Sequence, residues 1–273
     1  MYPENFIVNA DDFGIDLSIS KGILKCVENN LINSLSVVPF KDEPQTKLLK
    51  TIIEQYPQIK IGCHLSLIET QPLLESTLEK SADKRPPNNF KDFLMCYLTG
   101  RISTDKIKAE FMAQINWLQS LGVNIEHLDS HQHIHILPGV WRVVDELKKE
   151  FSINRVRIPF ESLGASAFRS FPFGLAMQIL AGLRSRPEEK FFGFLTSTKY
   201  NYETYNSKYK EILKNPQVHY ELMVHPGHIP QDSEIKFSEW NANWEGEILE
   251  LGKLKGFFLG FSGEKSSFQA RPE

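Results

Sequence analysis

The sequence predicts an α/β fold in which a mostly parallel sheet is open or closed into a barrel. Two observations carry this prediction. Apolar strand candidates alternate with helical patterns along the 273 residues, and polar clusters follow the carboxyl ends of four separate strand candidates. The second observation favours the barrel, because the reactive groups of α/β barrels gather on the rim formed by those strand ends.

The alternation begins close to the N-terminus. Residues 6–8 form an apolar strand candidate, and a helix with apolar positions four residues apart follows over 19–31. A second strand is predicted at 34–38 and a third at 59–65, with a helix at 44–56 between them. These segments predict two consecutive strand–helix–strand units.

A long stretch without a clear period follows the third strand. Residues 68–92 contain three prolines and many polar side chains. Loops of this length in compact domains usually have a function or are disordered. We therefore expect an insertion or a lid in this part of the chain.

The strand–helix pattern resumes after this stretch. A helical pattern covers residues 104–121, with a serine or threonine able to cap its start and a glycine able to end it. A strand at 125–129, a helix at 140–151 and a strand at 153–158 follow in order. The alternation therefore extends well beyond the middle of the chain.

The last third of the chain is less regular. Residues from 160 to about 215 have no clear period, and we expect a variable region there that contains helices and an insertion. A strand at 220–224, a helix at 238–254 and a last strand at 257–261 complete the pattern. Because no internal repeat or linker divides the chain, we expect a single domain over residues 1–273.

The composition is that of an ordinary globular protein, with 41 % hydrophobic and 24 % charged residues and a formal net charge of −3. This balance gives no reason to expect nucleic acid or an anionic membrane as a partner. No apolar run approaches the roughly 20 residues of a membrane span. Three widely spaced cysteines and the absence of a leader pattern predict reduced thiols and a cytoplasmic location.

Two adjacent carboxylates, Asp11 and Asp12, follow the first strand candidate. One of them could coordinate a metal while the other acts as a general base. An aspartate-rich turn that caps the next helix is an equally common use of this pattern. His64 follows the third strand in the same way, although a lone histidine at a strand end is more often a structural residue.

Four of the eight histidines lie between His127 and His135, and this density indicates metal chemistry. In extended geometry His131, His133 and His135 would project to one side of the chain. One true ligand with accessory groups is the favoured interpretation, with Asp129 able to orient an imidazole, and a purely polar network is the alternative. His225 follows the late strand and precedes Pro-Gly, so that a turn holds it either as a general acid or as a structural residue.

Together these motifs resemble the carbohydrate deacetylases of the YdjC-like (chitooligosaccharide deacetylase) family. The matching strings occur in the same order over about residues 5–262: Val8-Asn-Ala-Asp-Asp-Phe-Gly14, Gly62-Cys-His64, His127-Leu-Asp-Ser-His131-Gln-His133-Ile-His135 and Met223-Val-His225-Pro-Gly227. The resemblance implies a distorted, TIM-like (β/α) barrel. It also implies one divalent metal ion, held by Asp12, His64 and His131.

The function that the resemblance implies is the removal of the N-acetyl group from an N-acetylated sugar. Asp11 would be the general base and His225 the general acid. His133, Asp129 and Arg157 would contact the substrate or support the site, and Arg157 could steady Asp11 or else lie on the surface.

Three questions stay open at this point. Two imidazole ligands suit zinc or another transition metal better than magnesium, but the family resemblance also admits magnesium. Hydrolysis of another amide or of a phosphoester, and a non-catalytic sugar-binding protein with a structural metal, are the alternative functions. The sequence also leaves a homodimer open.

Overall fold

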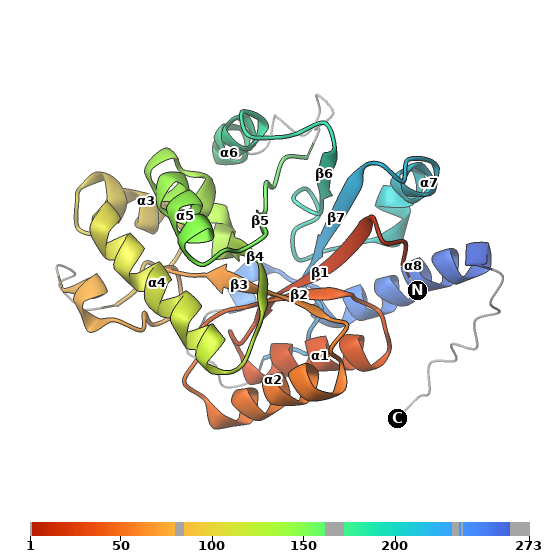
Figure 1. Cartoon of the computed structure of the whole chain (residues 1–273), viewed down its shortest axis with the longest axis horizontal. Coiled ribbons are helices and arrows are strands. Elements are labelled where there is room, and N and C mark those ends of the chain that lie inside the picture. Colours follow the sequence, from red (N-terminus) through yellow and green to blue (C-terminus); the bar gives the residue numbers. More distant parts are fainter. Residues whose placement is uncertain (1, 80–84, 162–171, 231–234, 236, 263–273) are drawn as a thin grey trace.

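A parallel sheet forms the centre of the protein (Figure 1). The structure is a computed structural model that describes residues 2–79, 85–161, 172–230, 235 and 237–262. Within these ranges the sheet has seven strands in the order β5-β4-β3-β2-β1-β7-β6, and every pairing is parallel. The strands are β1 (Phe6–Phe13), β2 (Ser34–Val37), β3 (Lys60–Leu65), β4 (Ile125–Ser130), β5 (Arg155–Val156), β6 (Glu189–Phe192) and β7 (His219–Val224).

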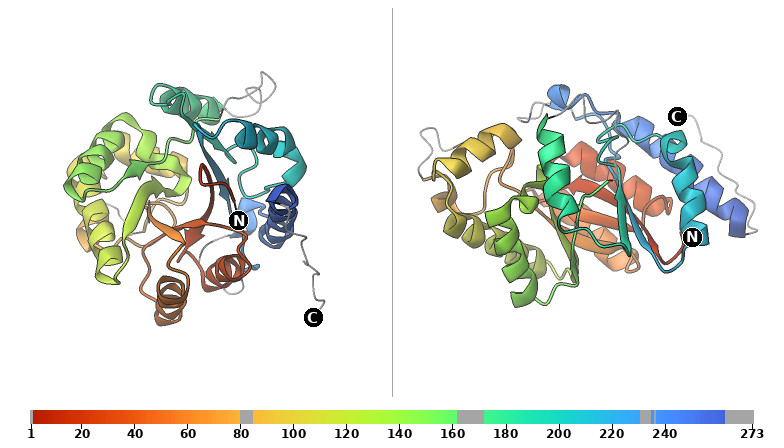
Figure 2. Two further views of the ribbon diagram at one scale, coloured as in Figure 1. Left: turned by 45° about the vertical axis from the view of Figure 1, so that its right-hand side comes forward. Right: turned by 90° about the horizontal axis from the view of Figure 1, so that it is seen from above.

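The sheet curls into a half-barrel with the helices outside it (Figure 2). In the described part of the chain β5 and β6 stand at the two ends of the strand order and do not pair with each other. The predicted distorted barrel is therefore confirmed as an α/β half-barrel, and its open side lies between β5 and β6. Most strand positions are buried, as expected for a parallel sheet covered by helices.

Helices connect the strands and cover the outer face of the sheet (Figure 1). Their bounds are α1 (Leu17–Glu28), α2 (Glu43–Gln55), α3 (Phe90–Leu98), α4 (Thr104–Ser120), α5 (Pro138–Glu150), α6 (Pro172–Gly182), α7 (Asn206–Lys214) and α8 (Trp244–Ser262). Short 3₁₀ turns are η1 (Glu75–Leu78), η2 (His131–Ile136), η4 (Tyr202–Tyr205) and η5 (Phe237–Trp240). None of the helices in the described ranges is long and apolar enough to cross a membrane.

The ends of these helices follow the local signals of the sequence. Asp16 caps α1 by accepting a hydrogen bond from the backbone N–H of Ser18. Ser103 caps α4 in the same way, and Gly122 ends that helix with a φ of +86°. Pro138 occupies the first turn of α5, where its missing N–H costs nothing.

The prediction of a last strand at residues 257–261 is wrong, because these residues belong to α8. Its apolar residues continue the helical spacing, since Leu251, Leu254 and Phe258 are all buried on one face of α8. The ring of Phe258 packs against Phe6 of β1 with 5.4 Å between centroids. A short apolar run does not distinguish a strand from the end of a buried helix, and the tertiary contacts decided between them here.

The two regions predicted as irregular contain elements that the sequence pattern did not reveal. In the region 160–215 the structure has α6, β6, η4 and α7, and β6 is only four residues long. In the region 68–92 it has η1 and the start of α3. The carboxylate of Glu110 in α4 accepts hydrogen bonds from the backbone N–H groups of Leu73 and Leu74 and ties this region to the helix layer. Residues 80–84 and 162–171 of these regions lie outside the described part.

Candidate metal centre and active site

The carboxyl ends of β1, β3, β4 and β7 surround a cavity of about 780 Å³. The cavity is lined by the polar residues expected at these four strand ends, namely Asp11, Asp12, His64, His131 and His225. Each of the five is at most 8 % exposed. The fold therefore brings residues from both ends of the chain into one buried polar site.

A bulge in β1 brings both adjacent aspartates into this cavity. In a regular strand neighbouring side chains point to opposite faces of the sheet. Here Ala10 pairs with Leu35 and Phe13 with Val37, so that β1 has one residue more than β2 over this stretch. Asp12 also has a left-handed backbone with a φ of +69°. Both carboxylates consequently line the site.

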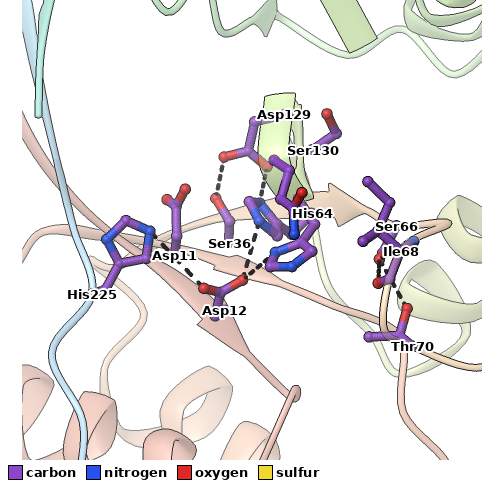
Figure 3. Close-up of polar contacts among 12 residues, drawn as sticks. Asp11, Asp12, Ser36, His64, Ser66, Ile68, Thr70, Asp129, Ser130 and His225 are labelled. Carbon is purple, nitrogen blue, oxygen red and sulfur yellow. Dashed lines mark hydrogen bonds and ion pairs between the residues drawn. The ribbon is translucent and has the colours of Figure 1, made fainter. Parts of the chain in front are cut away.

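The carboxylate of Asp12 contacts the imidazole of His64 (Figure 3) and that of His131. Its Oδ1 is 2.9 Å from Nδ1 of His131 and 3.3 Å from Nε2 of His64. One ligand atom from each of these three residues lies within 4.8 Å of the others. The arrangement offers one carboxylate oxygen and two imidazole nitrogens to a divalent cation.

Asp129 contacts the imidazole of His64 on the edge that faces away from Asp12. The two residues are paired neighbours on β3 and β4, and Nδ1 of His64 is 2.8 Å from Oδ1 of Asp129. The hydroxyl of Ser36 donates a hydrogen bond to the other oxygen of Asp129 at 2.6 Å (Figure 3). A carboxylate in this place fixes the orientation of an imidazole and turns its second nitrogen, Nε2, toward Asp12.

The histidine tract is not extended, and the prediction that three alternate histidines project to one side is wrong. The tract forms η2, in which Gln132 and His133 have left-handed φ angles of 50° and 55°. This tight turn separates the imidazoles. His131 joins the group around Asp12, whereas His133 stacks on Phe194 with 5.6 Å between ring centroids.

The remaining histidines of the tract are buried in hydrogen-bonded positions. Nε2 of His135 donates to the backbone carbonyl of Arg157 at 2.9 Å, and its Nδ1 accepts from the hydroxyl of Ser130 at 2.6 Å. His127 lies inside the sheet, 3.0 Å from the hydroxyl of Ser36. In the structure only His131 and His133 of the four line the cavity.

Asp11 forms a bidentate ion pair with Arg157, which is 1 % exposed and so does not lie on the surface. Nη1 of Arg157 is 2.6 Å from Oδ2 of Asp11, and Nη2 is 2.7 Å from Oδ1. The amide of Asn9 donates a further hydrogen bond to Oδ1 at 2.7 Å. The same guanidinium contacts Asp129 at 2.9 Å and Glu221 at 2.6 Å. Arg157 thus balances the buried carboxylates and restricts the orientation of Asp11.

His225 is held by contacts from two other elements. Its backbone N–H donates to the buried carboxylate of Glu247 in α8. Its Nδ1 accepts a hydrogen bond from the backbone N–H of Thr198 at 3.3 Å. Its Nε2 therefore carries the proton, and it faces the site at 3.9 Å from Oδ2 of Asp12.

The charges of this group stabilise one another. Burial alone would raise the pKa of Asp12, but the nearby imidazoles of His131 and His64 outweigh it and hold the pKa well below its usual range. Burial lowers the pKa of His64, whereas Asp129 and Asp11 raise it more strongly, to about 10. For His131 the attraction of Asp12 and a hydrogen bond to Glu69 outweigh burial and raise the pKa to about 9. A divalent cation would replace the protons that these imidazoles otherwise hold.

Several residues of the site were not found by the sequence analysis. Asn9 and Ser36 lie inside strands and contact Asp11 and Asp129, while Glu221, Glu247, Glu69 and Trp240 come from four other segments. Asn9 could have been found, because it shares a strand face with Asp11 at a spacing of two residues. Glu69 gave no signal, since it is a single residue in a segment without a period. Trp240 lies at the start of the segment predicted as a helix over 238–254, and the helical pattern gave no sign of its contact with Glu69.

The chain is similar to known proteins over most of its length. The model of the YdjC-like protein family matches residues 5–255. A carbohydrate deacetylase of Halalkalibacterium halodurans is 29 % identical over 254 residues, which are 91 % of this chain and 94 % of that protein. A carbohydrate deacetylase of Xenopus laevis is 26 % identical, with 93 % of each chain covered.

A solved structure from Enterococcus faecalis V583, provisionally described as a cellobiose-phosphate cleavage protein, has the same fold. It superposes with a TM-score of 0.67 at 16 % identity and covers 96 % of both chains. At this identity the likeness concerns the fold alone. The family match spans nearly all of the elements that form the half-barrel and its rim, including every residue of the site described above. The chain therefore belongs to the YdjC-like protein family.

Proposed function

We propose that the protein is a metal-dependent hydrolase that removes the N-acetyl group from an N-acetylated carbohydrate. The observation that carries the proposal is the convergence of Asp12, His64 and His131 beside Asp11 and His225 in one cavity. The carbohydrate deacetylases among the relatives support the substrate class.

The residues present fit a divalent metal ion. The three ligand atoms are close together, and Asp129 already orients one of the imidazoles. Two imidazoles and one carboxylate favour zinc or another transition ion over magnesium, which prefers oxygen ligands. When bound, such an ion would act as a Lewis acid, lowering the pKa of a water molecule and polarising the carbonyl oxygen of the substrate.

Asp11 is the proposed general base. Its carboxylate lines the cavity next to Asp12, and Arg157 and Asn9 hold it in one orientation. In this position Asp11 would accept the proton of the attacking water, as a fixed carboxylate within hydrogen-bond reach can do. Arg157 compensates the negative charge of Asp11 in the resting site and limits its movement.

His225 is the proposed general acid. Nε2 of His225 points into the site, and its Nδ1 contacts the backbone N–H of Thr198. After taking up a second proton, His225 as an imidazolium would donate the Nε2 proton to the nitrogen of the acetamide as the C–N bond breaks, and a neutral imidazole would remain. The products are acetate and a sugar with a free amino group.

The cavity wall supports a sugar as the occupant. Trp240, Phe194 and Phe90 contribute aromatic faces, on which sugar rings can stack. His133 lines the same wall, and we assign it a substrate contact through its ring.

The contacts of Arg157 argue for one metal ion rather than two. A two-metal phosphoester hydrolase would need further carboxylates next to the first ion. Asp11 and Asp129 are carboxylates in that position, and the guanidinium of Arg157 already forms ion pairs with both. We therefore propose amide hydrolysis with a single metal ion per chain.

The experiment that tests this function is the release of acetate from di-N-acetylchitobiose by protein loaded with zinc, magnesium or another divalent ion. Acetate release that requires an added ion and disappears with a chelator is the expected result. A panel of N-acetylated sugars of different lengths would then define the substrate. Binding of these sugars without any acetate release, with every ion tested, would contradict the proposal.

A further inference from the structure

Glu69 contacts the candidate metal centre from the side opposite to Asp12. It lies in the loop after β3, and its Oε2 is 2.9 Å from Nε2 of His131. On the other edge of the same ring, Nδ1 of His131 is 2.9 Å from Oδ1 of Asp12. The imidazole of His131 is thus held between two carboxylates, only one of which belongs to the ligand group.

The same arrangement surrounds the other imidazole of the site. Nδ1 of His64 is 2.8 Å from Asp129, and its Nε2 faces Asp12 at 3.3 Å. Each histidine therefore has Asp12 on one side and a supporting carboxylate on the other. A supporting carboxylate of this kind fixes which nitrogen carries the proton and makes the other a better ligand.

The carboxylate of Glu69 has further partners, which come from distant parts of the chain. Its Oε1 accepts a hydrogen bond from the indole Nε1 of Trp240 at 3.0 Å. Its Oε2 accepts a second hydrogen bond, at 3.2 Å, from the side-chain amide of Gln132. The indole of Trp240 in turn stacks on the ring of His131, with 5.4 Å between centroids and 30° between planes. The side chain of Glu69 thus connects three segments, namely η2, η5 and the loop after β3.

The backbone around Glu69 is arranged to present this carboxylate. Glu69 has a left-handed φ of +63°, which is costly for a residue with a side chain. Its N–H donates to the carbonyl of Pro87 at 2.8 Å. The residues before and after it in the chain form a compact hydrogen-bonded turn of Ser66, Ile68 and Thr70 (Figure 3). Strain that the surroundings maintain in this way is common at functional sites.

We propose that Glu69 is a positioning residue of the metal centre, which holds His131 with Nδ1 toward Asp12 and anchors Trp240 across the imidazole ring. This inference rests on the proposed function, because it assigns Glu69 a role toward the metal ion. Nε2 of His131 donates a hydrogen bond to Glu69, and the lone pair of Nδ1 is left to face the ion. Trp240 covers the ring and forms part of the cavity wall.

The test compares zinc affinity in the wild-type protein and in Glu69→Gln and Glu69→Ala, measured by competition with a chromophoric chelator. Removing a supporting carboxylate commonly weakens metal binding by about 10- to 100-fold. We expect the larger loss for Glu69→Ala and a smaller one for Glu69→Gln, which keeps the shape and a hydrogen-bond acceptor. The visible absorption spectrum of the cobalt-loaded protein should change in both variants, because the orientation of one ligand is altered.

A matched control comes from the same loop. Glu75 begins η1 and is exposed, so Glu75→Gln removes the same charge without touching the site, and we expect its zinc affinity to equal that of the wild type. A second readout needs no metal. The indole N–H signal of Trp240 in the ¹H–¹⁵N NMR spectrum, assigned by its loss in Trp240→Phe, should shift in Glu69→Ala.

The outcomes separate this inference from the proposed function. Wild-type zinc affinity and an unchanged cobalt spectrum in both Glu69 variants would overturn the inference and leave the proposed function standing. If the wild-type protein itself binds no metal ion, the proposed function fails and the inference fails with it. Should Glu69→Ala not fold, Glu69→Gln carries the same comparison.

Discussion

Asp11 and Asp12 are neighbours in the chain, but their carboxylates have different partners. Asp12 faces the imidazoles of His64 and His131, whereas Asp11 is held by the guanidinium of Arg157 and the amide of Asn9. The bulge in β1 allows both to line the same cavity. Two residues of the same type are thus given different chemical surroundings, which suits one for a metal ligand and the other for a base.

This difference predicts that the same substitution removes a different property at each of the two positions. Asp11→Asn should retain metal binding and lose activity by about 10²- to 10⁴-fold, the range expected for a missing general base. Asp12→Asn should lose the metal ion itself. Metal content and acetate release measured on both variants would check this. Asp105→Asn, at an exposed position in the first turn of α4, serves as the control and should keep both properties. A fully active Asp11→Asn would rule out Asp11 as the base.

His135 predicts a dependence of stability on pH. Burial lowers its pKa to about 4 in the folded protein, against roughly 6.5 for an unperturbed histidine. Between these values the unfolded chain binds the proton more tightly, so the contribution of His135 to the free energy of unfolding falls as the pH drops from about 6.5 to 4. At full effect this loss is about 3 kcal/mol.

Urea unfolding of the wild type and of His135→Gln at several pH values would measure this contribution. The difference between the two proteins should be largest near neutral pH and shrink toward pH 4. A constant difference over this range would show that His135 does not titrate with the assigned pKa.

At the scale of elements, α1 and α8 support the site from outside the sheet. Glu247 of α8 accepts the backbone N–H groups of His225 and Tyr200, so a buried carboxylate of this helix fixes the turn after β7. Gly22 of α1 packs directly on the same turn. A Cβ added at Gly22 would lie 2.4 Å from Cα of Gly227. The absence of a side chain at Gly22 therefore permits this close approach.

One substitution should consequently have opposite effects in the two helices. Gly22→Ala should destabilise the protein, by about 1–3 kcal/mol as for other overpacked sites, and should reduce activity because the turn that carries His225 shifts. At Gly256 in α8 an added Cβ meets no atom of the described residues within 4 Å. Gly256→Ala should therefore stabilise the helix by about 0.4–1 kcal/mol.

Both values can be obtained from urea unfolding curves, together with kcat for the two variants. A stabilising effect of Gly22→Ala would be incompatible with the contact between α1 and the turn. A destabilising effect of Gly256→Ala would contradict the helical assignment of the segment around it.

At the scale of the whole molecule, the site joins segments that are far apart in the chain. Its proposed metal ligands come from β1, β3 and η2, while the residues that contact them or hold the site come from β4, the loop after β3, the position after β5, β7, α8 and η5. A metal ion bound to Asp12, His64 and His131 would therefore link the N-terminal and central strands. Binding to the folded state alone raises the free energy of unfolding.

We accordingly expect one metal ion per chain and a stability that depends on it. At a free metal concentration about 100-fold above the dissociation constant, the stabilisation is about 2.7 kcal/mol. Chelation should lower the melting temperature, and the addition of one equivalent of zinc should restore it. Elemental analysis would give the stoichiometry. Two ions per chain, or a melting temperature unaffected by chelation, would contradict the single-metal site.

The sequence by itself determined the residue types at the strand ends and the alternation that places them on one rim. Asp11, Asp12, His64, His131 and His225 could be predicted because each follows a local apolar pattern, and the parallel strands of an α/β fold end on the same side. The N-terminal caps of α1 and α4 likewise involve residues only two or three positions apart in the sequence. Such features depend on a few consecutive residues and can therefore be predicted from the sequence.

Only the tertiary structure decided the partner of each functional group. Four features depend on residues distant in sequence: the tight turn of the histidine tract, the helical conformation of residues 257–261, the pairing of Arg157 with Asp11 and the approach of Glu69 to His131. No local period marks them, because a single arginine or glutamate in an irregular segment gains its role from the side chains that folding brings around it. The residue types of the site can thus be predicted from the sequence, whereas their geometry is determined by tertiary packing.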